Sequence, residues 1–184
     1  MSANDETVFR VKHIVVIRDN HKTLVPIILQ SANGPCPLIA IVNILLIQGK
    51  LQIHQDYAEI SYNELVTQLT DRLFRTRYND PEYQLNFERN VADVLESVLP
   101  CVKDGLDLNI GFSGIGSFEY TRQLALFDVF NITLYHGWLP DKQDKKTYDI
   151  VSKLKYNELV ELVTNMQILR MERKLKSNKP SSSS

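Results

Sequence analysis

The most constraining feature of this chain is an apolar run that follows a cysteine and a proline. In residues 38–47 a single polar side chain, Asn43, interrupts the apolar sequence. The run is far below the roughly 20 residues that cross a bilayer, so it predicts a helix buried in a protein core. Proline suits the first position of a helix and glycine the residue past its end, so Pro37 and Gly49 delimit a helix over residues 37–48. The rest of the chain must supply a core around this helix.

The size and composition of the chain fit a single globular domain. Its 184 residues, 43% hydrophobic and 23% charged, are enough to bury a core without metals or disulfides, and we expect no cofactor. Two cysteines, Cys36 and Cys101, without a secretory signal indicate a reducing compartment, the cytosol or the nucleus. The net charge of -1 gives no reason to expect nucleic acid or a membrane as partner, and the basic residues gathered in 170–184 would give only salt-sensitive contacts.

The remaining patterns mix extended and helical segments without strict alternation, which predicts an α+β fold rather than a doubly wound sheet. Residues 9–17 and 23–29 predict the two strands of a hairpin, with Pro26 at a sheet edge or a bulge. Ser61 and Glu64 form a capping box that begins a second helix. Further helices are expected over residues 90–99, 124–130 and 156–175, strands over 106–110 and 132–138, and a loop over 139–146.

Cys36 is the candidate nucleophile, at the N-cap of the apolar helix or one step before it. Unpaired N–H groups and the positive end of the helix dipole stabilise a thiolate there. The turn residues 33–35 would bring the chain to the helix start, and the side-chain N–H of Gln30 could donate to an oxyanion in the same space. By residue type alone, a free cysteine is more often a small buried hydrophobe, and a glutamine at a strand end is usually just solvated.

Four blocks of the sequence point to a known family. They are residues 30–45, beginning Gln30-Ser31-Ala32-Asn33-Gly34-Pro35-Cys36-Pro37; residues 105–128, beginning Gly105-Leu106-Asp107-Leu108-Asn109; Leu134-Tyr135-His136-Gly137-Trp138-Leu139; and Lys155-Tyr156-Asn157-Glu158-Leu159-Val160. In this order, over roughly residues 8 to 165, they resemble the MINDY family of cysteine deubiquitinases. The resemblance implies a variant of the papain-like cysteine peptidase fold, incomplete at its C-terminus. The deubiquitinase portion would cover residues 8–175, followed by a disordered Ser/Lys-rich tail over 176–184.

The same resemblance implies roles for four residues and a substrate. Cys36 matches the nucleophile of the family and Gln30 its oxyanion-stabilising glutamine, and the substrate would be polyubiquitin linked through lysine 48. Leu108 and Trp138 fall where the family contacts the apolar surface of ubiquitin. By residue type alone, Leu108 fits the core of a strand equally well, and Trp138 fits partial burial.

A thiolate also needs a proton acceptor that later protonates the leaving amine, and histidine usually does both. In the MINDY family this histidine stands in an Asn-His-Phe motif downstream of the Tyr-His-Gly-Trp segment, and these 184 residues contain no such motif. His13, His21 and His54 are most simply strand, turn and surface residues. His136 lies in a matching block, but the family has a histidine there besides its catalytic one, so we expect a hydrogen-bonded structural residue.

The sequence therefore predicts a thiol-dependent ubiquitinyl hydrolase by family, monomeric, whose 184 residues alone are weakly active or inactive. A first alternative is a non-catalytic polyubiquitin-binding module. A second is a truncated product, from an incomplete gene model or a shortened splice form, which would leave apolar surface exposed.

Overall fold

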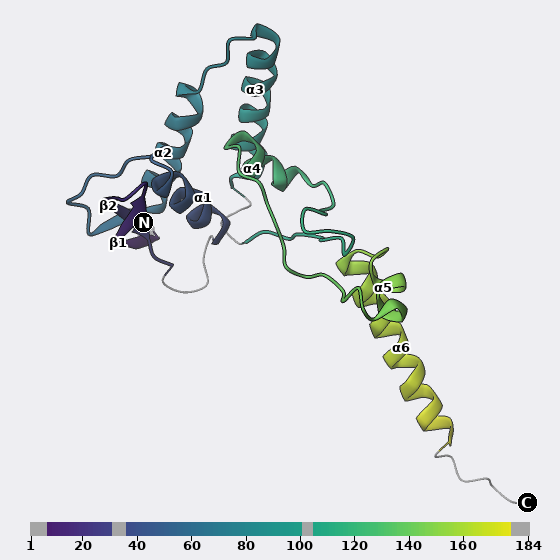
Figure 1. The fold of residues 1–184 in the computed structure, drawn as a ribbon. Helices are drawn as coiled ribbons and strands as arrows, with labels where there is room; N and C mark the ends of the chain where they lie inside the picture. Colours follow the sequence, from purple (N-terminus) through teal and green to yellow (C-terminus); the bar gives the residue numbers. More distant parts are fainter. Residues whose placement is uncertain (1–6, 31–35, 101–104, 178–184) are drawn as a thin grey trace, which may run out of the picture. The chain divides into compact units, whose positions relative to one another are not determined.

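The structure is a computed structural model that describes residues 7–30, 36–100 and 105–177, with side chains for all of these except Cys36 and residues 175–177. The chain divides into two compact units (Figure 1). Unit 1 consists of Met1–Leu106 and Thr121–Thr133, and unit 2 of Asp107–Tyr120 and Leu134–Ser184. Both helix and sheet are present, as expected for an α+β fold. No helix in the described ranges is long and apolar enough to span a membrane.

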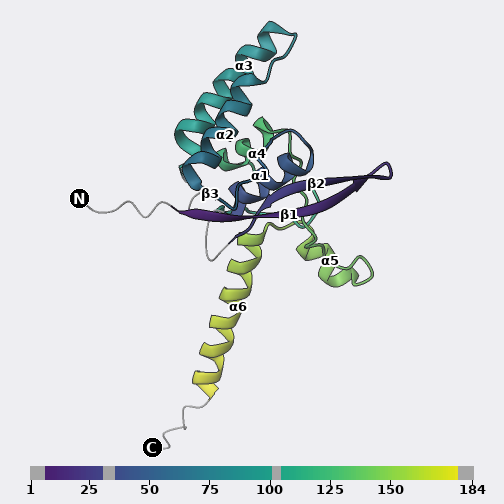
Figure 2. The same ribbon diagram turned by 90° about the vertical axis from the view of Figure 1, so that its left-hand side faces the viewer.

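The sheet of unit 1 is built on the predicted hairpin. Strands β1 (Val8–Arg18) and β2 (His21–Ile28) pair antiparallel, and β3 (Glu59–Ser61) pairs with the other edge of β1 (Figure 2). Asp19 and Asn20 form the two-residue turn with φ of 46° and 65°. Positive φ at both central residues matches the twist of the strands, and Asp and Asn tolerate it better than most residues. β2 is an edge strand of this sheet, which confirms the position predicted for Pro26.

The apolar run forms α1 (Cys36–Ile47), which packs against β2. Its side chains form the centre of the core of unit 1. The most deeply buried, each no more than 1% exposed, are Leu38, Ile41, Val42 and Leu45. Gly49 follows the helix with a φ of +71°, as a residue past a helix end often does. The helix starts one residue earlier than predicted, so Cys36 is its first residue rather than its N-cap. Proline fits the second position too, because the first four N–H groups have no intrahelical partner.

Three further helical segments complete unit 1. In α2 (Tyr62–Arg75) the hydroxyl of Ser61 accepts a hydrogen bond from the N–H of Glu64 at 3.2 Å, which confirms the cap. α3 (Pro81–Asp93) continues into a π-helical turn, Val94–Val98, so the helix predicted over 90–99 begins nine residues earlier. Asp80 caps it and Pro81 is its first residue, a start signal that the apolar pattern alone missed. α4 (Ala125–Val129), after a 3₁₀ turn at Arg122–Leu124, confirms the short helix.

Residues 106–110 and 132–138 form no strand, so the two strands predicted there are wrong. Segment 106–110 contributes one isolated bridge, between Ile110 and Phe118. Segment 132–138 is divided between the two units and follows a turn at Asn131, where φ is 53°. Alternating apolar residues suit a pleated surface, but a strand also needs a partner along its length.

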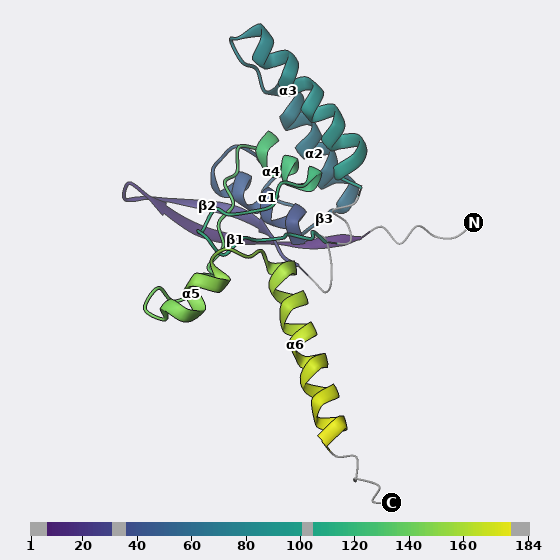
Figure 3. The ribbon, with the colours of Figure 1, turned by 90° about the vertical axis from the view of Figure 1, so that its right-hand side faces the viewer.

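Unit 2 contains two helices within its described residues (Figure 3). α5 (Lys145–Val151) occupies part of the expected loop and begins where Asp144 accepts from the N–H of Thr147 at 3.2 Å. α6 (Tyr156–Ser177) confirms the last predicted helix and extends two residues beyond it. Residues 178–184 of the predicted tail lie outside the described residues. Seven apolar side chains of α6 are 43–63% exposed: Val160, Leu162, Val163, Met166, Ile168, Leu169 and Met171.

Candidate active site

The polar side chain inside the apolar run holds the end of β2 against α1. Asn43 accepts a hydrogen bond from the N–H of Ile28 at 2.7 Å and donates to the carbonyl oxygen of Ile28 at 2.9 Å. Both backbone groups of the last residue of β2 are thereby satisfied by one amide. Asn43 lies seven residues after Cys36, which is about two helical turns. The end of β2 is therefore held at a fixed position along the axis of α1, about two turns from the start of the helix.

Cys36 and Gln30 lie at the two ends of the connection between β2 and α1. Gln30 is exposed, two residues after the strand, and Cys36 opens the helix. The first turn of α1 contains no acidic residue, so no carboxylate there opposes a negative charge at the helix N-terminus. Gln30 follows the strand as predicted, and Cys36 lies at the helix start, one position further into the helix than predicted. The turn predicted over 33–35 and the side chain of Cys36 lie outside the described residues.

The two residues expected to contact ubiquitin are in unit 2, and both are exposed. Leu108 is 36% exposed and Trp138 62% exposed, so neither the strand core nor the partial burial considered for them is found. The indole of Trp138 packs edge-on against the ring of Tyr156, with centroids 5.9 Å apart. Tryptophan is enriched among the residues that contribute most to binding at protein interfaces.

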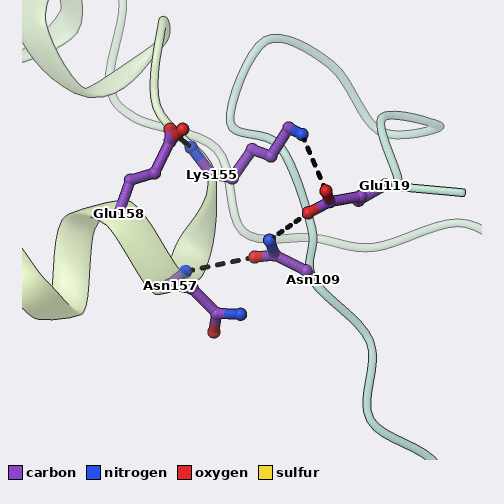
Figure 4. A network of polar contacts seen from close by, with 5 residues as sticks. All are labelled: Asn109, Glu119, Lys155, Asn157 and Glu158. Carbon is purple, nitrogen blue, oxygen red and sulfur yellow. Dashed lines mark hydrogen bonds and ion pairs between the residues drawn. The ribbon is translucent and has the colours of Figure 1, made fainter. Parts of the chain in front are cut away.

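A polar network lies at the start of α6 (Figure 4). The amide of Asn109 accepts from the backbone N–H of Asn157 at 3.1 Å and donates to the carboxylate of Glu119. The same carboxylate pairs with the ammonium group of Lys155 at 3.3 Å. Glu158 reaches back to accept from the N–H of Lys155 at 2.8 Å, as a capping residue does at the third position of a helix.

Glu119 is held in its charged form by this network. The hydrogen bond from Asn109 is the largest cause and the pairing with Lys155 the next, and together they lower the pKa of Glu119 below its usual 4.5. Hydrogen bonds to a carboxylate stabilise its ionised form. The sequence pattern indicated none of these contacts, because the residues that make them are up to 48 positions apart.

The four histidines have different surroundings. The ring of His136 packs edge-on against Phe118 at 5.3 Å, and neither ring nitrogen has a hydrogen-bond partner within the described ranges. The backbone N–H of His136 donates to the carbonyl of Ile115 at 2.9 Å, while its ring packs against Phe118. His54 lies 3.4 Å from the carboxylate of Asp56, with both side chains exposed. His13 lies in β1, and His21 begins β2 rather than lying in the turn.

Other features of the described residues do not support a catalytic role. A groove of about 830 Å³ in unit 1 is lined by residues 23–26 of β2 and by residues 51–56, but not by Gln30. In the part of the chain that the structure describes, no three His, Cys, Asp or Glu side chains gather as a metal site would require.

The fold and this site define a class of protein: a mixed α+β protein in which a cysteine begins a buried helix. A glutamine lies two residues after the strand that precedes this helix. A sequence model of the MINDY deubiquitinase family matches residues 7–184, and the chain belongs to that family. The match extends beyond residue 165, where the recognised blocks end.

Individual relatives agree with the family. The chain is 46% identical over 140 residues to ubiquitin carboxyl-terminal hydrolase MINDY-1 of Bos taurus, a stretch that covers 75% of this chain and 30% of the relative. The human MINDY-1 is 44% identical over the same shares. MINDY-2 of Bos taurus is 38% identical over 160 residues, covering 86% of this chain and 25% of the relative. The chain thus spans less than a third of the length of these relatives.

Proposed function

We propose that this chain carries the nucleophile half of a thiol-dependent ubiquitinyl hydrolase with a papain-like fold. The observation that carries the proposal is the hydrogen-bonded pair of Asn43 and Ile28, which fixes the strand leading to Gln30 against the helix that begins at Cys36. The names of the relatives, ubiquitin carboxyl-terminal hydrolases, support ubiquitin as the substrate. The catalytic portion is assigned to residues 8–175, and the tail predicted over 176–184 can begin only after Ser177, the last residue of α6.

In the proposed reaction the Cys36 thiolate attacks the carbonyl carbon of an isopeptide bond. The N–H groups of Gln30 donate to the resulting oxyanion. Collapse of the tetrahedral intermediate breaks the bond to the lysine nitrogen, which leaves as an amine after accepting a proton, and water then hydrolyses the thioester at Cys36. These 184 residues contain no Asn-His-Phe segment to deliver the proton, so we expect turnover by this chain alone to be weak or absent.

The test distinguishes the reaction of the nucleophile with a probe from complete turnover of a substrate. We expect a ubiquitin probe with an electrophilic C-terminus to label the chain slowly, and to label neither Cys36→Ala nor Gln30→Ala at a comparable rate. Cys101→Ala is the matched control, because it removes the other cysteine and should label like the parent. Labelling that persists in Cys36→Ala would refute the assignment of the nucleophile. Rapid turnover of lysine-48 chains by the parent would refute the need for a further histidine.

Lysine-48-linked polyubiquitin is the proposed substrate and partner, in the cytosol or the nucleus. A panel of diubiquitins of different linkage tests the selectivity, with binding measured on Cys36→Ala so that cleavage does not interfere. Equal binding of all linkages would contradict it.

A second candidate function is polyubiquitin binding without catalysis, which the exposed Trp138 favours. We expect lysine-48-linked tetraubiquitin to bind the Cys36→Ala protein and to bind much more weakly after Trp138→Ala. Phe74→Ala is the control, because Phe74 is an apolar side chain of α2 in unit 1 with a similar exposure of 58%. No binding by the parent at high micromolar concentration would exclude this function.

A further inference from the structure

The segment 109–112 is the organising element of unit 2. On one side it bonds to residues 117–119, where the N–H of Gly111 donates to Ser117 at 2.8 Å and the carbonyl of Asn109 accepts from Glu119 at 2.8 Å. On its other side it meets the start of α6, where the N–H of Phe112 donates to Leu154 at 3.1 Å. These backbone bonds join segment 109–112 to the nearby residues 117–119 and to Leu154, which is far along the chain.

Asn109 is the residue of this segment whose side chain reaches both neighbours. Its amide oxygen accepts from the N–H of Asn157 in the first turn of α6, a group that has no partner inside the helix. Its amide nitrogen donates to Glu119, which in turn pairs with Lys155 (Figure 4). An amide supplies a donor and an acceptor at once, and both are used here.

The two residues proposed to contact ubiquitin are attached to the two parts that Asn109 joins. Leu108 directly precedes Asn109. Trp138 packs on the ring of Tyr156, and the N–H of Tyr156 donates to the carbonyl of Ile110 at 2.8 Å. The position of Leu108 relative to the pair of aromatic rings therefore depends on the bonds between segment 109–110 and residues 156–157.

We propose that Asn109 is a positioning residue that clamps the segment carrying Leu108 to the start of α6 and so holds Leu108 and Trp138 as one preformed surface for ubiquitin. The inference rests on the proposed function, because ubiquitin is the ligand of that surface. Preforming a surface strengthens binding because fewer groups have to be ordered when the partner arrives.

The substitution that tests the clamp is Asn109→Asp, which has nearly the same shape. It keeps an acceptor for the N–H of Asn157 but loses the donor to Glu119 and places two carboxylates together. We expect lysine-48-linked tetraubiquitin to bind about threefold to tenfold more weakly, with a faster dissociation rate. Adding Glu119→Gln to Asn109→Asp reverses donor and acceptor across this contact, and should restore most of the affinity.

A second readout does not depend on ubiquitin. Trp138 is the single tryptophan of the chain, so its fluorescence reports the surface directly. We expect Asn109→Asp to raise the mobility of Trp138, seen as lower fluorescence anisotropy, and the double variant to return it to the parent value. The helical content of the whole chain, measured by far-UV circular dichroism, should be unchanged in both variants, which separates positioning from general unfolding.

The possible outcomes distinguish the two claims. Parent-like anisotropy together with parent-like binding in Asn109→Asp overturns the positioning role. Failure of the double variant to recover also overturns it. If the parent chain itself does not bind tetraubiquitin, the proposed function fails and ubiquitin is removed as the ligand, while the anisotropy still decides whether Asn109 holds the aromatic pair.

Discussion

Units 1 and 2 are stabilised by different kinds of interaction. Among the described residues the buried apolar side chains lie in unit 1, with Phe112 as the exception in unit 2. Unit 2 depends instead on exposed hydrogen bonds and an ion pair around Asn109, Glu119 and Lys155. Burial of apolar surface contributes more stability per residue than exposed polar contacts do. The region proposed to hold the nucleophile is thus stabilised mainly by a buried apolar core, and the region proposed to bind ubiquitin mainly by polar contacts.

The largest effect should come from the core of unit 1. Ile41→Ala removes a fully buried side chain of α1 and should lower the free energy of unfolding by about 2–5 kcal/mol. Leu169→Ala on α6, where the side chain is 54% exposed, is the matched change in unit 2 and should cost no more than about 0.5 kcal/mol. Urea denaturation followed by circular dichroism measures both. Equal costs would mean that the two units do not differ in this way.

A smaller effect is expected for the polar contact between Asn43 and Ile28 beside the apolar core of unit 1. Asn43→Leu keeps α1 apolar but leaves the N–H and carbonyl of Ile28 without their partner, at a cost of about 1–3 kcal/mol. Because the end of β2 is then released, the pH dependence of the alkylation of Cys36 by iodoacetamide should also change. Asn157→Ala is the control, since Asn157 contributes its backbone N–H to the network of unit 2. An unchanged unfolding free energy in Asn43→Leu would contradict the role of this tether.

A smaller change in stability is expected in unit 2, where the backbone of Gly111 lies close to Ser117. A Cβ at Gly111 would lie 2.3 Å from the hydroxyl oxygen of Ser117, which would have to rotate away from Ser113. We expect Gly111→Ala to destabilise unit 2 by about 1 kcal/mol. Gly114→Ala, at a position where nothing lies within 4 Å of the added carbon, should be close to neutral. The midpoint of Trp138 fluorescence in urea compares the two variants.

The smallest effect is a dependence on pH that should be confined to unit 2. The pKa of Glu119 is lowered on folding by Asn109 and Lys155, so its contribution to stability is complete above the usual value of 4.5 and is lost as the pH falls through the lower folded pKa. Glu119→Gln should remove this dependence. Titration of Trp138 anisotropy from pH 7 downward measures it, and an identical acid transition in Glu119→Gln would argue against it.

Local signals predicted much of unit 1. The turn at Asp19 and Asn20, the cap at Ser61 and the apolar run of α1 each act over a few residues, so their patterns can be read directly. The segments 106–110 and 132–138 failed because a strand depends on a partner that a pattern does not reveal. The start of α3 was predictable from Asp80 and Pro81.

The candidate site was predictable in part. The apolar run and the strand pattern predicted a helix start at Cys36 and a strand end before Gln30, and the structure has both within a residue or two. Asn43 was noticed only as an interruption of the apolar run, although it turns out to fix the strand end. The contacts of Asn109 bridge ten residues to Glu119 and 48 to Asn157, and no periodicity in the sequence encodes them.

The attachment of α1 at two places along its axis has a consequence for insertions and deletions. Besides the bond at Asn43, the guanidinium of Arg18 at the end of β1 donates to the carbonyl of Ile47 at the last residue of the helix. One residue added between Cys36 and Asn43 would rotate the start of the helix by about 100° and shift it by about 1.5 Å, while both attachments stayed in place. Length changes there should redirect the cysteine, whereas the same changes after Gly49 should leave its direction intact.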